Sequence, residues 1–149
     1  GNITRLLEFN FDSGAGVPMQ DYAGTVSFFG AGLGTSYPEW KTNLNVAYDV
    51  GDFTFDARVR YTSSMTNRLL TIFPGEREFG GGPPNVPAVT YVDLGASWDV
   101  SPNIRLRVGV NNVADEQPPL YSPNVQSGTE PSLYDVVGRR AFGQIELKF

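Results

Sequence analysis

The sequence contains no cysteine and no histidine among its 149 residues. Without cysteine the chain can form neither a disulfide nor a thiolate metal site. Without histidine it cannot build a Ser-His-Asp triad, a Cys-His pair or a histidine-ligated zinc site. A pair of carboxylates could still catalyse hydrolysis. Asp93 and Asp99 share one strand face, but they are about 20 Å apart, which is too far for both carboxylates to act on one bond. We therefore expect no enzyme activity, no cofactor and no metal site.

Clustered basic residues and long hydrophobic runs are also missing. The 11 Lys and Arg residues are scattered and are outnumbered by 16 Asp and Glu, for a net charge of -5. Because phosphate binding requires clustered cations, a nucleic-acid partner is excluded. No stretch approaches the roughly 18–20 apolar residues of a membrane helix, which excludes a helical membrane protein. The sequence opens on Gly1 without an initiator Met or a signal peptide, so we expect a fragment of a longer protein.

The sequence does contain alternating apolar and polar residues. The chain is 40% hydrophobic and 13% aromatic, with 17 Gly and 11 Pro, a composition that favours strands joined by turns. Even positions of 40–50 are mostly apolar, and after Gly51–Asp52 the odd positions of 53–61 become apolar. A two-residue hairpin requires this inversion, because Val50 and Phe53 then face each other and all apolar side chains share one face.

Two further segments alternate in the same way and are joined by the three-residue loop 101–103, which preserves the parity of the apolar positions. If Val100 faces Ile104 across this loop, then Asp99 faces Arg105 on the polar side. We therefore predict an ion pair between Asp99 and Arg105.

With one weaker strand at each end, the pattern predicts an all-β, antiparallel up-and-down meander of about six strands. Two connections take two or three residues, whereas the links at about 12–38, 63–88 and 112–135 are long and rich in Gly and Pro. Short turns at one end and long loops at the other are typical of an outer-membrane barrel with its turns on the periplasmic side. The predicted strands are 2–12, 39–50, 53–63, 88–100, 104–112 and 136–149.

Aromatic residues gather at both ends of the predicted apolar face, as in the two aromatic girdles of a membrane barrel. Trp40 and Tyr48 are eight residues apart on one face. In a tilted strand this is roughly 20 Å along the membrane normal, close to the apolar band of about 25 Å. The predicted girdle consists of Trp40, Tyr48, Phe53, Tyr61 and Trp98, with Phe149 near the turn end.

Four segments carry motifs at the starts and ends of these strands. They are 38–44 (Pro-Glu-Trp-Lys-Thr-Asn-Leu), 61–65 (Tyr-Thr-Ser-Ser-Met), 110–119 (Val-Asn-Asn-Val-Ala-Asp-Glu-Gln-Pro-Pro) and 134–142 (Tyr-Asp-Val-Val-Gly-Arg-Arg-Ala-Phe). Together they resemble the C-terminal barrel of TonB-dependent outer-membrane receptors, from about Tyr37 to the terminus. The sequence departs from the family pattern at Val113 and Ala114, where Leu-Phe is commoner. The final strand is similar to the family's terminal strand, in which Ile145, Leu147 and Phe149 would serve as the assembly signal.

The resemblance implies a 22-stranded transmembrane barrel of the bacterial outer membrane, plugged by an N-terminal domain. Such a receptor imports a scarce ligand, for instance an iron-siderophore, with energy from the TonB complex. This chain would supply the last six strands and three outer loops, while the plug would lie outside it. Its partners would be the lipid bilayer, the rest of the barrel, the plug, the TonB complex through the plug, and a small-molecule ligand that the sequence does not identify.

Charged side chains on the polar strand faces would line the lumen of such a barrel. They would contact the ligand or the plug, or simply belong to an interior that is polar in any case. Few acidic residues are expected beside Arg58 and Arg60, which makes these two the better candidates for plug contacts. The lumen-facing candidates are Arg58, Arg60, Asp93, Arg105 and Arg107.

Two alternatives remain open at this point: a soluble β-sandwich binding domain and a small complete outer-membrane barrel. A sandwich core favours Val, Leu and Ile throughout, and closed single-chain bacterial barrels start at eight strands. In a barrel, an Arg at Val46 or Val108 should destabilise the fold, whereas changes at Asn45 or Gly109 should be milder. In the isolated chain, the edge strands 2–12 and 136–149 would lack partners, so we expect self-association through them.

Overall fold

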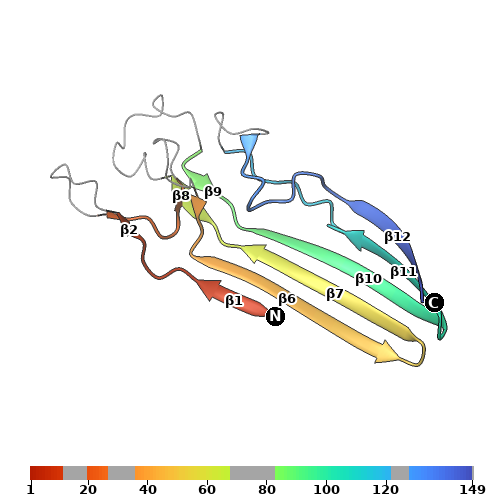
Figure 1. Ribbon diagram of the computed structural model, residues 1–149. Coiled ribbons are helices and arrows are strands. Elements are labelled where there is room, and N and C mark those ends of the chain that lie inside the picture. The colour runs from red at the N-terminus through yellow and green to blue at the C-terminus, as the bar shows by residue number, and fades with distance from the viewer. Residues whose placement is uncertain (12–19, 27–35, 68–82, 122–127, 149) are drawn as a thin grey trace.

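The protein is all-β and is built around one six-stranded antiparallel sheet. The computed structural model describes residues 1–11, 20–26, 36–67, 83–121 and 128–148. The sheet runs in the order β1-β6-β7-β10-β11-β12, so the strands follow one another across it in chain order, as a meander requires (Figure 1). These strands are β1 (Asn2–Arg5), β6 (Trp40–Val50), β7 (Phe53–Thr62), β10 (Val89–Ser101), β11 (Ile104–Asn111) and β12 (Arg140–Leu147).

The pairing of β6 with β7 follows the predicted hairpin. Val50 lies opposite Phe53 and Leu44 lies opposite Val59, so the apolar side chains of the two strands share a face. Gly51 opens the turn with a φ of 58°, a left-handed conformation that glycine adopts without steric cost. The predicted register of this hairpin is confirmed.

The β10–β11 hairpin departs from the predicted register at one residue. Asp99 faces Arg105 as expected, but Ser101, not Val100, faces Ile104. A register shift between Asp99 and Ser101 leaves Val100 as the extra residue of a β-bulge. The predicted pairing of Val100 with Ile104 is therefore wrong, although the alternation on either side of the bulge is kept.

Both end strands are shorter than predicted. The first leaves the sheet after Arg5, and the next residue, Leu6, donates its backbone N–H to the Glu39 carbonyl oxygen at 2.8 Å. Farther along, β2 (Asn10–Phe11) pairs with β3 (Gln20–Asp21) in a separate two-stranded sheet. The last strand begins at Arg140 instead of 136, because Gly138 bends the chain with a φ of 79°.

A second, four-stranded sheet lies beyond the loop end of the large sheet, where Figure 1 shows β8 and β9. Its order is β5-β4-β8-β9, and β4 and β8 run parallel. The buried hydrophobic core lies at this end of the molecule and includes Val89 and Tyr91 from the start of β10. The small strands are β4 (Thr25–Val26), β5 (Ser36–Tyr37), β8 (Met65–Asn67) and β9 (Asn85–Val86). The core consists of Val26, Met65, Val86, Val89, Tyr91, Tyr121 and Tyr134.

The large sheet is open in the part of the chain that the structure describes. Strands β1 and β12 are its two edges, and they do not pair with each other there. Among the same residues, no helix is long and apolar enough to cross a membrane.

Candidate functional site

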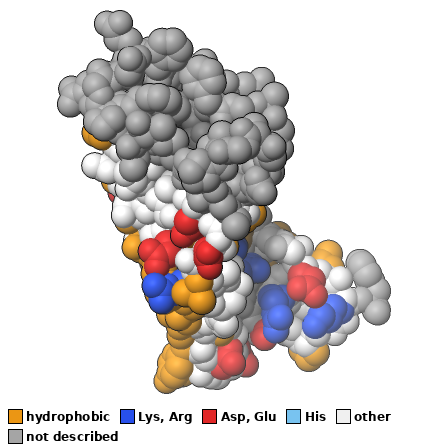
Figure 2. Space-filling model, turned by 90° about the vertical axis from the view of Figure 1, so that its left-hand side faces the viewer, with side chains coloured by type: hydrophobic (Ala, Val, Ile, Leu, Met, Phe, Trp, Pro, Cys, Tyr) orange, Lys and Arg blue, Asp and Glu red, His pale blue; other side chains and the backbone are white. Residues whose placement is uncertain are grey.

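The two faces of the large sheet differ sharply in chemistry. On one face, large apolar side chains are exposed in every strand; Val46 is 56% exposed, Val108 59% and Ile145 68%. Figure 2 shows hydrophobic side chains gathered along one edge of the lower part of the molecule, beside charged ones. A contiguous apolar surface of this kind marks an interface with lipid or protein. Its exposed members include Ile3, Leu44, Val46, Tyr48, Val50, Phe53, Phe55, Leu94, Trp98, Ile104, Val108, Ile145 and Leu147.

Both ends of this apolar face carry aromatic residues at the predicted girdle positions. At the turn end the rings of Phe53 and Trp98 stack with centroids 5.7 Å apart. At the loop end the Arg5 guanidinium lies 4.9 Å from the centre of the Trp40 ring and also binds Glu39 at 2.8 Å. Tyr48 and Tyr61 lie on the same face, opposite Phe55 and Thr42. Phe149 lies outside the described residues. Ile145 faces Leu106 of the neighbouring strand β11, and Leu147 faces Ile104 of the same strand.

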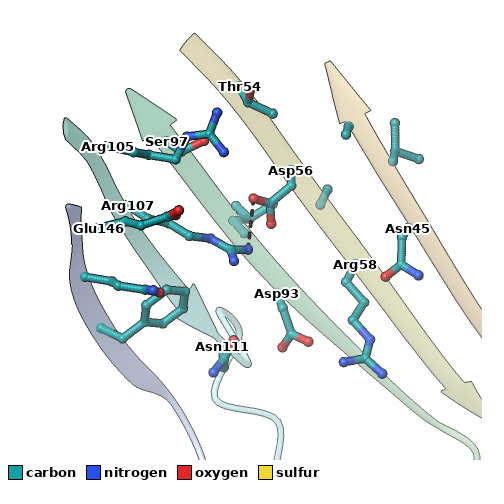
Figure 3. Close-up of a pocket in the computed structure, with 16 residues that line it drawn as sticks. Asn45, Thr54, Asp56, Arg58, Asp93, Ser97, Arg105, Arg107, Asn111 and Glu146 are labelled. Atoms are coloured by element: carbon teal, nitrogen blue, oxygen red, sulfur yellow. Dashed lines mark hydrogen bonds and ion pairs between the residues drawn. The ribbon is translucent and has the colours of Figure 1, made fainter. Parts of the chain in front are cut away.

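The opposite, polar face holds all five predicted lumen candidates and contains a hollow of about 660 Å³ (Figure 3). Asp99 and Arg105 form the predicted ion pair, at 2.5 Å between Arg105 Nε and a carboxylate oxygen. Arg107 reaches across β10 to Asp56 at 3.3 Å. The hollow is lined from β6, β7, β10, β11 and β12, and its charged residues are Asp56, Arg58, Asp93, Arg105, Arg107 and Glu146.

Two glycines make room for large side chains on this polar face. A Cβ at Gly95 would lie 2.6 Å from the Asp56 carboxylate oxygens, which reach over Gly95 toward Arg107. A Cβ at Gly109 would lie 2.5 Å from the Phe142 ring and 2.8 Å from the Leu94 carbonyl oxygen. Changes at Gly109 were expected to be milder than an arginine at Val46 or Val108, because Gly109 faces away from the apolar side. A side chain at Gly109 would have to displace the Phe142 ring and would crowd the Leu94 carbonyl oxygen.

Arg60 is the centre of a network that ties a distant loop to the sheet. Its guanidinium makes two hydrogen bonds to Asp93, at 3.1 and 3.0 Å, and lies 3.4 Å from Asp135. Asp135, whose side chain is only 4% exposed, also pairs with Arg140 at 3.0 Å. Asp93 in turn accepts the backbone N–H of Asn112 at 2.8 Å. We call these five residues the rim network. The expectation that Arg60 has few acidic neighbours is therefore wrong.

Asn112 shapes the start of the loop that the rim network holds. It is fully buried and has a φ of 51°, in the left-handed region that asparagine tolerates better than most residues. Its side chain donates to the Glu116 carbonyl oxygen at 3.0 Å and accepts the Glu116 N–H at 2.9 Å. Sequence reasoning missed Asn112 and Asp135. The Asn-Asn pair at the end of a strand could have indicated the turn at Asn112.

Arg58 differs from the other arginines of the polar strand faces. Its Nε donates to Asn43 Oδ1 at 2.9 Å, and it forms no ion pair with any residue that the structure describes. The expectation of few acidic partners thus holds for Arg58. Asp93 lies directly opposite it in the register, but the Asp93 carboxylate turns to Arg60.

A second cavity, of about 540 Å³, lies where the polar face meets the last loop. Lys41, Arg58 and Arg60 line it from the sheet, and Ser132 and Leu133 line it from the loop. No Asp or Glu is among the described residues that line it. We call it the cationic cavity. An arrangement of this kind can hold an anionic group by ion pairing.

Residues 6–113 match a family model described as TonB dependent receptor-like, beta-barrel. This match covers more than two thirds of the chain. No curated protein and no solved structure matches the chain.

Proposed function

This chain belongs to the family of TonB-dependent receptor β-barrels, and from that premise we propose that it forms the last six strands of a 22-stranded barrel. Proteins of this family are transporters of the bacterial outer membrane and not enzymes. We propose that the complete receptor carries an N-terminal plug, draws energy from the TonB complex through that plug, and imports a scarce small molecule such as an iron-siderophore.

The exposed apolar face carries this proposal. A soluble β-sandwich would cover such a face with a second sheet, yet Val46 and Val108 are more than half exposed. In an outer-membrane barrel the same face contacts lipid, and the polar face looks into the lumen. The ion pairs of Arg105 and Arg107 on the polar face fit a water-filled or plug-filled interior.

The two ends of the sheet support an orientation in the membrane. The hairpin turns at Gly51–Asp52 and Pro102–Asn103 are short, whereas the opposite end carries the small sheet and the buried core. We propose that the turns face the periplasm and the core-bearing loops face outward. Trp40 and Tyr61 would then mark the outer interface, and Tyr48, Phe53 and Trp98 the inner one.

The proposal also assigns roles to the predicted site residues. Arg58, Arg60, Asp93, Arg105 and Arg107 would face the lumen, toward the plug or the solute. Ile145 and Leu147, exposed on the apolar face of β12, would form the assembly signal together with Phe149. Strand β12 would pair with a strand from the remainder of the receptor, as its free edge requires.

Cysteine labelling in the outer membrane tests the assignment of the faces. The chain has no native cysteine, so each variant carries a single cysteine in this part of the receptor. Val46→Cys and Val108→Cys should resist a water-soluble maleimide, whereas the polar-face control Gln144→Cys should react once the plug is removed. Equal reaction at Val46, Val108 and Gln144 would mean that water reaches both faces, and the proposal would be wrong.

A further inference from the structure

The cationic cavity contains two cations that form no ion pair with a described residue. Arg60, Arg105, Arg107 and Arg140 each have a carboxylate partner within 3.4 Å. Arg58 is the only arginine on the polar face of the described strands without one, and Lys41 likewise forms no ion pair with a described residue. Two cations of this cavity therefore form no ion pair with a described residue, whereas Arg105 and Arg107, in the hollow nearer the turns, are both paired; Arg58 lines both spaces.

The positions of these residues make the charges converge. Lys41 and Asn43 are alternate residues of β6, and Arg58 and Arg60 are alternate residues of β7, so all four lie on the polar face. Asn43 faces Arg60 in the register, but its side chain accepts from Arg58 at 2.9 Å. This bond draws the Arg58 guanidinium along the sheet toward the loop end, where Lys41 also lines the cavity.

The cavity has the size and position of a solute site. Its volume of about 540 Å³ falls within the roughly 300–1,000 Å³ of small-molecule sites. It lies under loop residues Ser132 and Leu133, at the end of the strands that the proposed orientation turns outward. A solute entering through the loops would meet these cations before the paired ions deeper in the lumen. Polar side chains of Asn2, Thr4 and Asn43 add hydrogen-bonding groups to its wall.

We propose that the cationic cavity binds an anionic group of the transported solute, through Arg58 and Lys41. The group would be a carboxylate or a phosphate, because a guanidinium matches the two oxygens of either and an ammonium adds a point charge. Arg60 would remain bound to Asp93 and Asp135 and would not pair with the anion. This inference rests on the proposed function and specifies the chemical class of the solute.

Citrate binding to the complete receptor at low ionic strength tests the inference, with neutral trimethyl citrate as the matched probe. Citrate should bind the parent receptor, and trimethyl citrate should not. Lys41→Gln and Arg58→Gln should each weaken citrate binding about tenfold or more, since each removes a charged partner. Arg58→Lys should restore part of the affinity. Arg5→Gln, which removes a cation that pairs with Glu39 beside Trp40 on the apolar face, should leave citrate binding unchanged.

Three results would overturn the inference: no citrate binding to the parent, equal binding in all variants, or binding that appears only after the plug is deleted. The last would mean that a plug carboxylate occupies the cavity. Insertion of each variant into the outer membrane is measured separately. Failed insertion of the parent would count against the proposed function itself, whereas normal insertion without citrate binding would count against this inference alone.

Discussion

An arginine placed at Val46 should destabilise the folded barrel by an amount set by its depth in the membrane. Val46 lies near the middle of β6 (Trp40–Val50), and its side chain is exposed on the apolar face. If that face contacts lipid, the substitution places a charge close to the bilayer midplane, where Arg costs about 2–4 kcal/mol. Val50, on the same face at the turn end, would lie at the interface, where the cost falls to about 0–1 kcal/mol.

Ala47 provides the matched control for this prediction. It follows Val46 in the same strand, it lies on the polar face, and it faces Asp56 of β7. An arginine there meets a carboxylate and water, so Ala47→Arg should change the free energy of unfolding by less than about 1 kcal/mol. The three variants therefore separate the effect of the face from the effect of the charge.

The assay is reversible unfolding of the complete receptor in phospholipid vesicles by guanidinium chloride, with the change in midpoint converted to free energy. The expected order of destabilisation is Val46→Arg, then Val50→Arg, then Ala47→Arg. Equal losses at Val46 and Val50 would indicate a dry protein core without a depth gradient. No loss at Val46 would show that water already reaches this face. Either result would refute the reasoning.

Further predictions concern the glycines, the rim network and the buried tyrosines. Gly109→Ala should cost about 1–3 kcal/mol through collision with Phe142, whereas Gly143→Ala, with no atom within 4 Å of its Cβ, should be nearly neutral in the same unfolding assay. Asp135→Asn should remove two ion pairs and speed hydrogen exchange across residues 130–139, whereas Glu39→Gln at an exposed pair should leave that exchange unchanged. Burial raises the pKa of Tyr121 to about 12, and it also raises the pKa of Tyr134. A raised tyrosine pKa gives stability that is complete below about pH 10 and lost as pH rises toward 12, so Tyr121→Phe should reduce the loss of stability in this range. An equal alkaline loss in both proteins would contradict the last prediction.

The faces of the large sheet were predictable from the sequence because the period of a strand is two residues. Once Val50 and Phe53 are paired across a two-residue turn, every other side chain of the hairpin is assigned to a face. The bulge at Val100 was not predicted, because one extra residue near a turn leaves the alternation of apolar and polar residues on either side unchanged.

The loop region was less predictable for two physical reasons. Strands β4, β5, β8 and β9 have two or three residues each, too few for a periodic pattern. The partners of the rim network are also far apart in the sequence: Arg60 and Asp135 are separated by 75 residues. Their contact depends on how the last loop folds back over the sheet, and local pattern carries no information about that.

The most direct test of the membrane assignment is quenching of Trp40 and Trp98 by brominated lipids in the reconstituted receptor. These are the only two tryptophans of the chain, so the signal of each is obtained by subtracting the spectrum of Trp40→Phe or Trp98→Phe from that of the parent. If the apolar face contacts lipid, both tryptophans should be quenched most strongly by bromines placed at shallow positions. Blue-shifted emission that no brominated lipid quenches would mean that protein covers this face, and it would contradict the account.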